Sequence, residues 1–394
     1  MVKEKVLIVG AGFAGTKAAL DLSSSEHFDI SLLSNKDDFT YYPTLYHVAT
    51  GSSRANALIP LKAIFADKNV TLIRGQAATL DRKTKTVTTL EGQSYHFDTL
   101  ILALGVVTNY FNIPGLAELS YGVKSIEDIE RLKKHLHEQI VSKHQPDLNY
   151  IIVGGGPTGV ELAGTLGIYL KHVMQRHAIE QRAIHIDLVE ASPRLLSALP
   201  KDVGRMAARR LKRLGVKLYL SQRVEGETAN DLVINDRPLQ SHTVIWTAGT
   251  SINPFFGANN FAFSANHKVA TDVYLQAEPN IFVLGDNANT PFSGLAQTAV
   301  HDGKYIARNL KRRADGKKMR SYSVHSPTTV IPIGEGWAAL IRGNIRIYGW
   351  LGWVLRQAAD IGAFHDYEPW TDSFKQWFSY TATEEQCPIC LHPD

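Results

Sequence analysis

The sequence predicts an α/β protein with two similar domains, each built around a parallel sheet, and a C-terminal segment of amphipathic helices. Three observations support this fold class: a glycine-rich turn directly after a short apolar run near residue 10, a second copy of the pattern near residue 154, and five of the six tryptophans in residues 337–394. With 394 residues, the chain is longer than one typical domain and is expected to form two or three.

The composition is that of an ordinary globular protein, with 44% hydrophobic and 20% charged residues. The net charge of +4 is compatible with an anionic cofactor or an anionic membrane surface, but it is too small to indicate nucleic acid as a partner. The N-terminus has no signal-peptide pattern, and no apolar run reaches the ~18 residues of a spanning helix. We therefore expect a cytoplasmic protein.

The first glycine-rich turn follows the apolar run at residues 6–9. Its sequence is Gly10-Ala11-Gly12-Phe13-Ala14-Gly15, and Ala18, Ala19 and Leu20 continue at helical spacing. In a strand–turn–helix unit of this kind, Gly10 permits the tight turn, Gly12 lets a pyrophosphate approach the backbone, and Gly15 lets the helix pack on the strand. The free N–H groups at the start of the helix, where Phe13 and Ala14 lie, favour an anion.

The same pattern returns after the apolar run at residues 150–153. It reads Gly154-Gly155-Gly156-Pro157-Thr158-Gly159 and is followed by Glu161, Leu162 and Ala163. One such turn is a weak signal, because glycine-rich turns follow many strands, but two in the same context rarely coincide by chance. The pair predicts two Rossmann-like domains, each binding a dinucleotide.

The two domains differ at the end of the strand that follows each glycine-rich turn and its helix. In the second, the run at residues 184–189 ends at Glu190, whose carboxylate can accept hydrogen bonds from an adenosine ribose and repel a 2′-phosphate. This favours NADH over NADPH; the alternative is a solvated glutamate. Glu190 follows Gly159 by more than the usual ~20 residues, which we attribute to a basic insert at residues 171–182. In the first domain, the run at residues 28–33 ends at Ser34 and Asn35 without an acid, and we place FAD there with Ser34 as a weaker ribose contact.

Two further strand ends repeat between the halves. The run at residues 97–102 leads into Ala103-Leu104-Gly105, and the run at residues 243–246 leads into Thr247-Ala248-Gly249, each at the same distance after its own glycine-rich turn. The matched spacing indicates two related modules. Later, the run at residues 280–284 closes on Gly285-Asp286. The acceptor-only carboxylate of Asp286 suits the ribityl hydroxyls of FAD, the alternative being a plain turn aspartate.

With these features in this order, the chain resembles the two-dinucleotide-binding flavoproteins, and among them the type II NADH dehydrogenases, which are single-subunit NADH:quinone oxidoreductases that do not pump protons. The resemblance covers nearly the whole chain. It implies an FAD domain formed by residues 1–116 and 264–328, and an NADH domain of residues 117–263 inserted between them. Residues 329–394 would form a membrane-associating segment with a flexible tail.

Three local segments favour this family over its relatives: residues 42–51 with Pro43, residues 105–115, and residues 296–309, which begin with Ala296-Gln297. The third is similar to the family helix that passes the flavin ring, and the resemblance assigns it to the quinone pocket. It thus implies Gln297 as a catalytic residue and Ala296 and Pro43 as cofactor neighbours. His301 stands where the family usually has a second glutamine. A histidine can donate a proton near neutral pH, so His301 is a candidate in quinone reduction.

Glu161 follows Gly159 by two residues, in what is expected to be the first turn of the second helix. The resemblance places it where the nicotinamide meets the flavin, and it could orient the carboxamide of NADH. The alternative is an acid that complements the helix dipole. Hydride transfer between two cofactors needs no protein nucleophile, so we expect neither a catalytic triad nor a metal.

The C-terminal segment contains two apolar faces at helical spacing. One comprises Ile347, Trp350, Leu351, Val354 and Leu355, and the other, after Pro369, comprises Trp370, Phe374, Trp377 and Phe378. Basic side chains are expected beside these faces, where they would meet anionic lipid headgroups: Arg342, Arg346, Arg356 and Lys375. The alternative is that the faces pack on the body of the protein or at a homodimer seam. The basic stretch at residues 311–320 is expected to be a solvated loop.

The sequence therefore predicts a peripheral membrane flavoenzyme on the cytoplasmic face, which passes a hydride from NADH to FAD and then electrons to a membrane quinone. Two alternatives stay open: an NADH-dependent reductase of a soluble, ferredoxin-like acceptor, and a slow flavin and NADH sensor. Relatives that need cysteines beside the flavin are disfavoured, because Cys387 and Cys390 are the only cysteines. With His392 they offer three ligands, short of a structural zinc site, and we interpret the pair as a chance feature of the tail.

Overall fold

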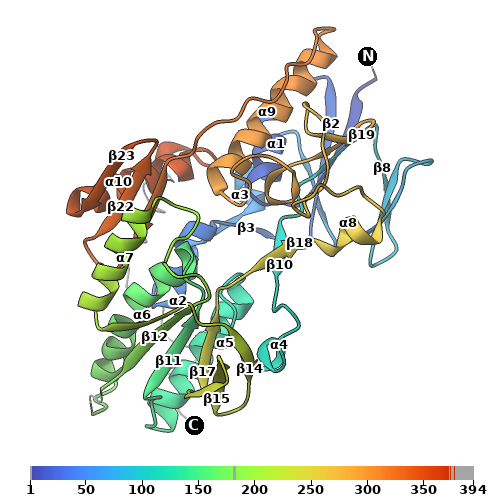
Figure 1. Ribbon diagram of the computed structural model, residues 1–394. Helices are drawn as coiled ribbons and strands as arrows, with labels where there is room; N and C mark the ends of the chain where they lie inside the picture. Colours follow the sequence, from blue (N-terminus) through green and yellow to red (C-terminus); the bar gives the residue numbers. More distant parts are fainter. Residues whose placement is uncertain (1, 181–182, 372, 374–376, 378–394) are drawn as a thin grey trace.

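The computed structural model describes residues 2–180, 183–371, 373 and 377, and it contains two separate parallel sheets, one in the upper and one in the lower half of Figure 1. The first sheet has six strands in the order β19-β20-β9-β1-β2-β5, all parallel to their neighbours except β19 with β20. The strands are Gln276–Glu278 (β19), Ile281–Val283 (β20), Thr99–Leu102 (β9), Glu4–Val9 (β1), Phe28–Ser34 (β2) and Thr71–Arg74 (β5). β20 pairs with β9 although more than 170 residues separate them, so the chain between β9 and β19 contains an insertion into the first domain.

Two helices pack against each other on the first sheet, α1 (Phe13–Leu22) and α9 (Ala296–Ala314). Their approach is closest at Gly303, where a Cβ atom would lie 2.6 Å from the carbonyl oxygen of Ala14. Only a glycine permits this crossing without a shift of backbone. α9 therefore lies directly beside the first glycine-rich turn.

The inserted chain forms the second sheet, which has four parallel strands in the order β13-β12-β11-β17. They are Val216–Leu220 (β13), His185–Glu190 (β12), Asn149–Val153 (β11) and Thr243–Trp246 (β17), and the main helices are α6 (Pro157–Arg176) and α7 (Lys201–Arg213). The long distance from Gly159 to Glu190 arises mainly from the 20 residues of α6. We predicted a basic insert at residues 171–182. Residues 171–176 instead belong to α6, so the prediction was wrong for this part.

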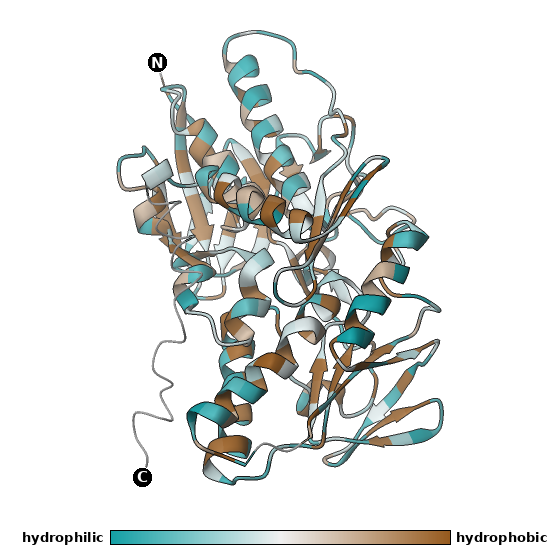
Figure 2. Ribbon diagram, turned by 90° about the vertical axis from the view of Figure 1, so that its left-hand side faces the viewer, coloured by the Kyte–Doolittle hydropathy of each residue, from teal (hydrophilic) through white to brown (hydrophobic). Residues whose placement is uncertain are grey.

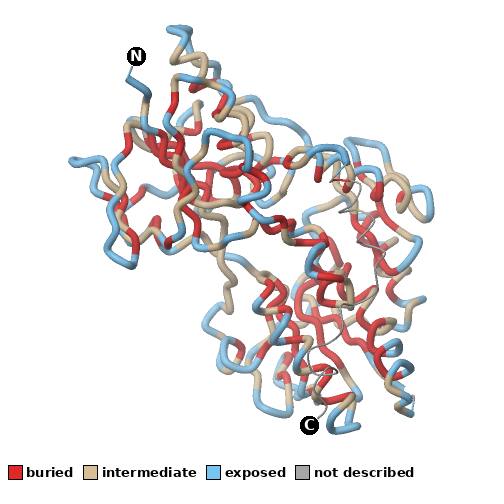
Figure 3. The backbone as a smooth tube through the Cα atoms, turned by 180° about the vertical axis from the view of Figure 1, so that it is seen from behind, coloured by how far each residue is buried: buried red, intermediate tan, exposed pale blue. Residues whose placement is uncertain are grey.

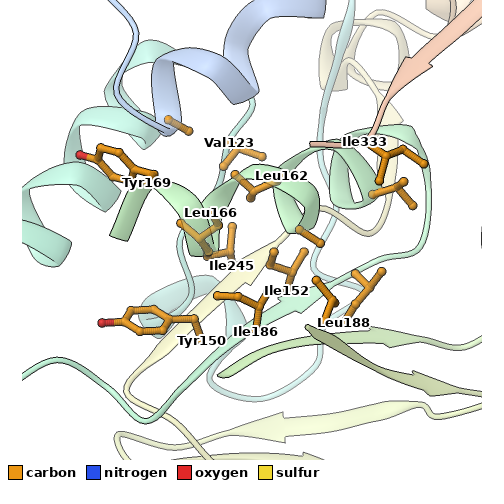
Figure 4. Packing of buried hydrophobic residues seen from close by; sticks show 14 of the residues in the cluster. Val123, Tyr150, Ile152, Leu162, Leu166, Tyr169, Ile186, Leu188, Ile245 and Ile333 are labelled. Carbon is orange, nitrogen blue, oxygen red and sulfur yellow. The ribbon is translucent and has the colours of Figure 1, made fainter. Parts of the chain in front are cut away.

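Each parallel sheet has its own hydrophobic core. Hydrophobic residues run along the strands of both sheets (Figure 2), and the buried residues gather in two regions of the backbone (Figure 3). In the second core, Leu162 and Leu166 of α6 pack over Ile152, Ile186 and Ile245 of the sheet (Figure 4). The predicted α/β architecture with two Rossmann-like domains, one inserted in the other, is confirmed.

Smaller elements complete and connect the two domains. After Gly105 and Gly249 the chain enters β10 (Val106–Thr108) and β18 (Thr250–Ile252), which pair antiparallel with each other and so join the two modules. The other strands are Asp38–Thr40 (β3), Leu58–Pro60 (β4), Ala77–Asp81 (β6), Thr86–Thr89 (β7), Ser94–His96 (β8), Val224–Glu227 (β14), Asp231–Ile234 (β15) and Arg237–Gln240 (β16). The shorter helices are Tyr42–Thr44 (η1), Leu45–Ala49 (α2), Arg54–Asn56 (η2), Leu61–Ile64 (α3), Leu116–Leu119 (α4), Ile126–His137 (α5), Glu138–Ser142 (η3), Pro254–Ala258 (α8) and Gly285–Asn287 (η4).

The C-terminal segment begins with a three-stranded antiparallel sheet before its helix. The elements are Thr329–Pro332 (β21), Ala338–Arg342 (β22), Ile345–Gly349 (β23) and Trp350–His365 (α10). The assignment of Ile347 to a helical face was wrong. Residues 345–348 alternate with the period of a strand, and Gly349, the last residue of β23, has φ 85° and directly precedes α10. Likewise, Lys311, Arg312 and Arg313 belong to the last turn of α9 and not to a loop.

The second predicted C-terminal face lies partly outside the described residues, as do Lys375 and the pair Cys387 and Cys390. In the part of the chain that the structure describes, no helix combines the length and the apolar character needed to cross a membrane.

Candidate active site

The first glycine-rich turn connects β1 to α1 and has one glycine that its own packing does not require. Gly10 has φ 106°, and a Cβ there would lie 2.3 Å from the carbonyl oxygen of Ala103. A Cβ on Gly15 would lie 1.9 Å from the carbonyl oxygen of Gly10. Around Gly12, by contrast, no described atom other than those of Gly12 and its two chain neighbours lies within 4 Å of the Cβ position. The open backbone at Gly12 fits the approach of a pyrophosphate to the start of α1.

The second glycine-rich turn has the same geometry between β11 and α6. Gly154 has φ 115°, and its Cβ would lie 2.7 Å from Oγ1 of Thr247 and 2.9 Å from the backbone nitrogen of Ala248. A Cβ on Gly159 would lie 1.9 Å from the carbonyl oxygen of Gly154. At Gly156, as at Gly12, no described atom beyond the glycine and its two chain neighbours lies within 4 Å of the Cβ position. The two turns are thus built alike, and each offers one open glycine to a ligand.

Glu190 is the last residue of β12 and lies against the second turn. Its Oε2 accepts a hydrogen bond from the backbone N–H of Gly155 at 2.5 Å, and its Oε1 accepts one from Ser192 at 2.6 Å. These bonds fix the carboxylate at the edge of the glycine-rich turn. The adenosine ribose of a dinucleotide lies at this place in a Rossmann domain.

Ser34 occupies the equivalent end of β2, but its hydroxyl is turned into its own loop. It donates to the carbonyl oxygen of Lys36 at 2.8 Å and accepts from the N–H of Lys36 at 3.0 Å. The neighbouring Asn35 is exposed. The first domain therefore holds no side chain that corresponds to the fixed carboxylate of Glu190 at this strand end.

Gly285 and Asp286 lie in η4, next to the turn at Gly105. Asn287 donates through Nδ2 to the carbonyl oxygen of Gly105 at 2.6 Å, which joins the two predicted segments. Oδ1 of Asp286 accepts from the N–H of Gly294 at 3.1 Å. The N–H of Gly285 donates to Oδ2 of the buried Asp302 at 2.9 Å, and Oδ1 of Asp302 accepts from Tyr322 at 2.7 Å. Burial raises the pKa of Asp302 to about 6.

Asn287 and Asp302 were not predicted from the sequence. Asn287 directly follows the Gly285-Asp286 motif, so its position was a usable signal. Asp302 lies in the middle of α9, where one acid among many polar residues gives no indication that it faces inward.

Glu161 is the fifth residue of α6 and is buried, with 9% of its surface exposed. It lies beyond the first turn, which contains no acid, so the explanation as an acid that complements the helix dipole does not fit. Burial raises the pKa of Glu161 to about 8, while the positive charge of Arg356 opposes the shift and the negative charge of Asp360 adds to it. At neutral pH the carboxyl group is mostly protonated and can donate a hydrogen bond.

A buried ion pair from α10 lies near Glu161. Nε of Arg356 donates to Oδ2 of Asp360 at 2.7 Å, and Tyr41 donates to Oδ1 of Asp360 at 3.0 Å. Arg356 also donates to the carbonyl oxygens of Pro43 and Val330, each at 3.1 Å. The expectation that Arg356 faces lipid headgroups was therefore wrong, because the buried Asp360 partners its charge. Asp360 follows Arg356 by four residues, and this helical spacing was a usable signal in the sequence for the ion pair.

Gln297 and His301 lie on successive turns of α9 and face the chain that leads to β21. Gln297 donates through Nε2 to the carbonyl oxygen of Thr328 and accepts from its N–H, both at 2.9 Å. Nε2 of His301 lies 2.9 Å from the carbonyl oxygen of Ser323, within hydrogen-bond distance. The imidazole ring of His301 stacks on that of His325. Within residues 2–180 and 183–371, no hydrogen bond or ion pair joins either side chain to Glu161.

A small cavity of about 140 Å³ is lined in part by Trp353 and Gln357 of α10. It is lined by Tyr46, His47, Thr165, Pro332, Gly334, Glu335, Gly336, Trp353 and Gln357. Burial lowers the pKa of His47 to about 3, so this ring is neutral at physiological pH. Among the described residues, no group of three or more His, Cys, Asp or Glu side chains could hold a metal ion.

Two parallel sheets, each with an open glycine at the start of its first helix, define a protein with two dinucleotide-binding domains. Residues 4–303 match the pyridine nucleotide-disulphide oxidoreductase family, and the chain belongs to this family.

Curated relatives carry a narrower description. The chain is 28% identical over 385 residues to the type II NADH:quinone oxidoreductase Ndh of Mycobacterium tuberculosis, covering 90% of this chain and 82% of that protein. It is 26% identical over 357 residues to the type II NADH:quinone oxidoreductase of Staphylococcus aureus, covering 84% and 88%. The fold matches that of NDH2 from Plasmodium falciparum, solved with NADH, with a TM-score of 0.86 at 17% identity over 96% of this chain and 98% of that one. The resemblance to type II NADH dehydrogenases is confirmed by these relatives.

Proposed function

We propose that this chain is an NADH:quinone oxidoreductase that uses FAD as the intermediate electron carrier and pumps no protons. The observation that carries the proposal is the pair of open glycines, Gly12 and Gly156, at matched turns in two separate parallel sheets. One dinucleotide at each turn supplies the two redox partners that such a reaction needs. The names of the curated relatives support this reading over a reductase of a soluble protein.

The first turn is assigned to FAD and the second to NADH. For FAD we propose Gly10, Gly12, Phe13, Ala14, Gly15, Ser34, Asn35, Pro43, Ala103, Gly105, Gly285, Asp286, Ala296 and Gln297. For NADH we propose Gly154, Gly156, Pro157, Thr158, Gly159, Glu161, Glu190, Ala248 and Gly249. Two features support the assignment: Glu190 suits an unphosphorylated ribose, and Asp286 lies in η4, just after strand β20 of the first sheet.

When bound, FAD supplies the chemistry that accepts a hydride and releases single electrons. The residues of this chain supply orientation. We propose that the protonated carboxyl group of Glu161 donates a hydrogen bond to the nicotinamide carboxamide, which its raised pKa permits at neutral pH. Gln297 and His301 are proposed to border the quinone, with Pro43 beside it; the bond from Arg356 holds the carbonyl of Pro43 in place.

We propose further that α10 lies on the cytoplasmic surface of a membrane. In α10, polar residues are buried and large apolar residues are exposed, which reverses the usual pattern of a surface helix. Arg356, Gln357 and Asp360 are buried, whereas Trp350 is 68% and Leu351 is 52% exposed. Ile345 in the neighbouring strand is 58% exposed. Exposed apolar side chains on one helix face suit a lipid interface, which is also where a quinone is dissolved. A second copy of this chain covering the same face is the alternative that a test must distinguish.

An anaerobic spectrum tests the function as a whole. The purified protein is mixed with NADH and then with a short-chain quinone, while the visible flavin bands are recorded. Bleaching by NADH followed by rapid return with the quinone is expected. Absence of flavin bands would remove FAD from the proposal, and bleaching without return would remove quinone as the acceptor and favour a protein acceptor or a sensor.

A further inference from the structure

The chain after α10 returns to the first glycine-rich turn, more than 350 residues away in sequence. The hydroxyl of Tyr367 donates to the carbonyl oxygen of Phe13 at 3.1 Å, in a buried position. Phe13 is the first residue of α1 and directly follows Gly12. A residue from the C-terminal segment therefore holds the turn at the point where its backbone is open.

The side chain of Phe13 is enclosed by aromatic rings from two parts of the chain. Phe39 and Tyr41 lie 5.2 and 5.8 Å from it, both edge-on, and Tyr367 lies at 6.1 Å. Tyr367 itself stacks on Phe39 with ring centres 4.3 Å apart. Edge-to-face and offset contacts of this kind add to the stabilisation from burial. They restrict how the first turn of α1 can tilt.

Asp366 fixes the position of Tyr367 from both sides. Its carboxylate accepts a hydrogen bond from Lys304 of α9 at 2.7 Å, and its carbonyl oxygen accepts one from Lys17 of α1 at 3.4 Å. α1 and α9 are the two helices that begin beside the proposed flavin. Asp366, the neighbour of Tyr367, is thus bonded to both helices, α1 and α9.

We propose that Tyr367 is a positioning residue for FAD: its hydroxyl holds the carbonyl of Phe13 so that the N–H groups at the start of α1 face the pyrophosphate. This inference rests on the proposed FAD site at Gly12. A structural alternative is that Tyr367 only fills the core. The hydroxyl group distinguishes the two roles. It is needed to hold the carbonyl of Phe13, whereas the ring would fill the core equally well without it.

The test compares Tyr367→Phe with the wild-type holoenzyme. The variant keeps the ring and removes only the donor to Phe13. We expect FAD to dissociate about fivefold faster, as expected for the loss of one neutral buried hydrogen bond at the binding turn. The rate is measured by the rise of flavin fluorescence after dilution of the holoenzyme, and the urea midpoint of unfolding is measured in parallel.

Tyr348→Phe is the matched control. Tyr348 also belongs to the C-terminal segment, and its hydroxyl donates to Oδ2 of Asp202 at 2.7 Å, on the inserted domain. This control should lower the unfolding midpoint without changing FAD dissociation by more than about twofold. Equal FAD dissociation in the two variants and the wild type would overturn the role of Tyr367. A wild-type protein that binds no FAD would instead contradict the proposed function, so the two failures are distinguishable.

Discussion

The backbone N–H of Gly155 donates to Oε2 of Glu190 at 2.5 Å, which ties the end of β12 to the middle of the second glycine-rich turn. The side chain is held in place by a second backbone bond, from Ser192. A carboxylate fixed in this way presents its negative charge at one position and does not adapt to a phosphate. Specificity for the nicotinamide cofactor is therefore expected to depend on this residue.

Replacing Glu190 by alanine should raise KM for NADH about tenfold and should increase the efficiency with NADPH relative to NADH. The reason is the loss of an acceptor for the ribose hydroxyls together with the loss of repulsion towards a 2′-phosphate. Steady-state kinetics with both cofactors measure the ratio. Ser34→Ala, at the equivalent strand end of the other domain, serves as the control and should leave the ratio unchanged. An unchanged ratio in Glu190→Ala would place the ribose elsewhere.

The two open glycines should separate the two cofactors. Gly12→Ala should fold but retain at least about tenfold less FAD, because the added methyl group meets the pyrophosphate and not the protein. Gly156→Ala should retain FAD and lose affinity for NADH to a similar degree. Flavin content and NADH titration measure the two effects. Gly362→Ala on α10, which also has open space around it, is the control and should change neither. Loss of both cofactors in either variant would argue against independent sites.

The buried carboxyl group of Glu161 should make the protein less stable as the pH rises from the ordinary pKa of a glutamate towards about 8. Its pKa is raised to about 8 in the folded protein, so the stability linked to its protonated form is present at low pH and is lost as the pH rises through about 8. The free energy of unfolding should fall by about 1.4 kcal/mol between pH 7 and pH 9.5 from this group alone. Urea titrations of the wild type and of Glu161→Gln, whose amide cannot ionise, isolate the contribution. Parallel curves for the two proteins would exclude Glu161 as the source.

His301 should affect the quinone half of the reaction and not the NADH half. His301→Gln is expected to leave flavin reduction by NADH within about twofold of the wild type and to flatten the pH dependence of quinone turnover around neutral pH. Stopped-flow reduction and steady-state turnover measure the halves separately. His325→Gln, which changes the ring stacked on His301, is the matched control. An unaltered pH profile in His301→Gln would remove this residue from proton delivery.

The exposed face of α10 should decide membrane binding. The double replacement Trp350→Ser with Leu351→Ser should reduce partitioning onto anionic vesicles by about tenfold or more, since each large apolar side chain contributes about 1.5–3 kcal/mol when it leaves water. Vesicle sedimentation measures the effect. Leu90→Ser provides the control, because Leu90 is 65% exposed and lies at the turn before β8, a strand that Figure 1 shows far from α10. If the double variant instead converts a dimer to a monomer with no change in vesicle binding, the face is a homodimer seam.

The sequence by itself determined the features that depend on neighbouring residues. Gly10, Gly12 and Gly15 act within one turn, and their counterparts Gly154, Gly156 and Gly159 repeat it, so local spacing was enough to predict two Rossmann-like folds. Glu190 was also predictable, since the end of a strand after such a turn has a fixed place in the fold. Ile347 was misassigned because a short apolar run fits a helix or a strand, and only the pairing of β23 with β22 decides between them.

The tertiary structure decided the contacts between distant segments. Tyr367 meets Phe13 and Arg356 meets Pro43 across more than 300 residues, and no local pattern records such a pair. The same holds for the pKa of Glu161, which depends on its burial and on the charges of Arg356 and Asp360. Local spacing fixes backbone turns, because the steric limits act within a few residues. The electrostatics of a buried side chain depend on whatever the fold places beside it, and that is known only once the chain is packed.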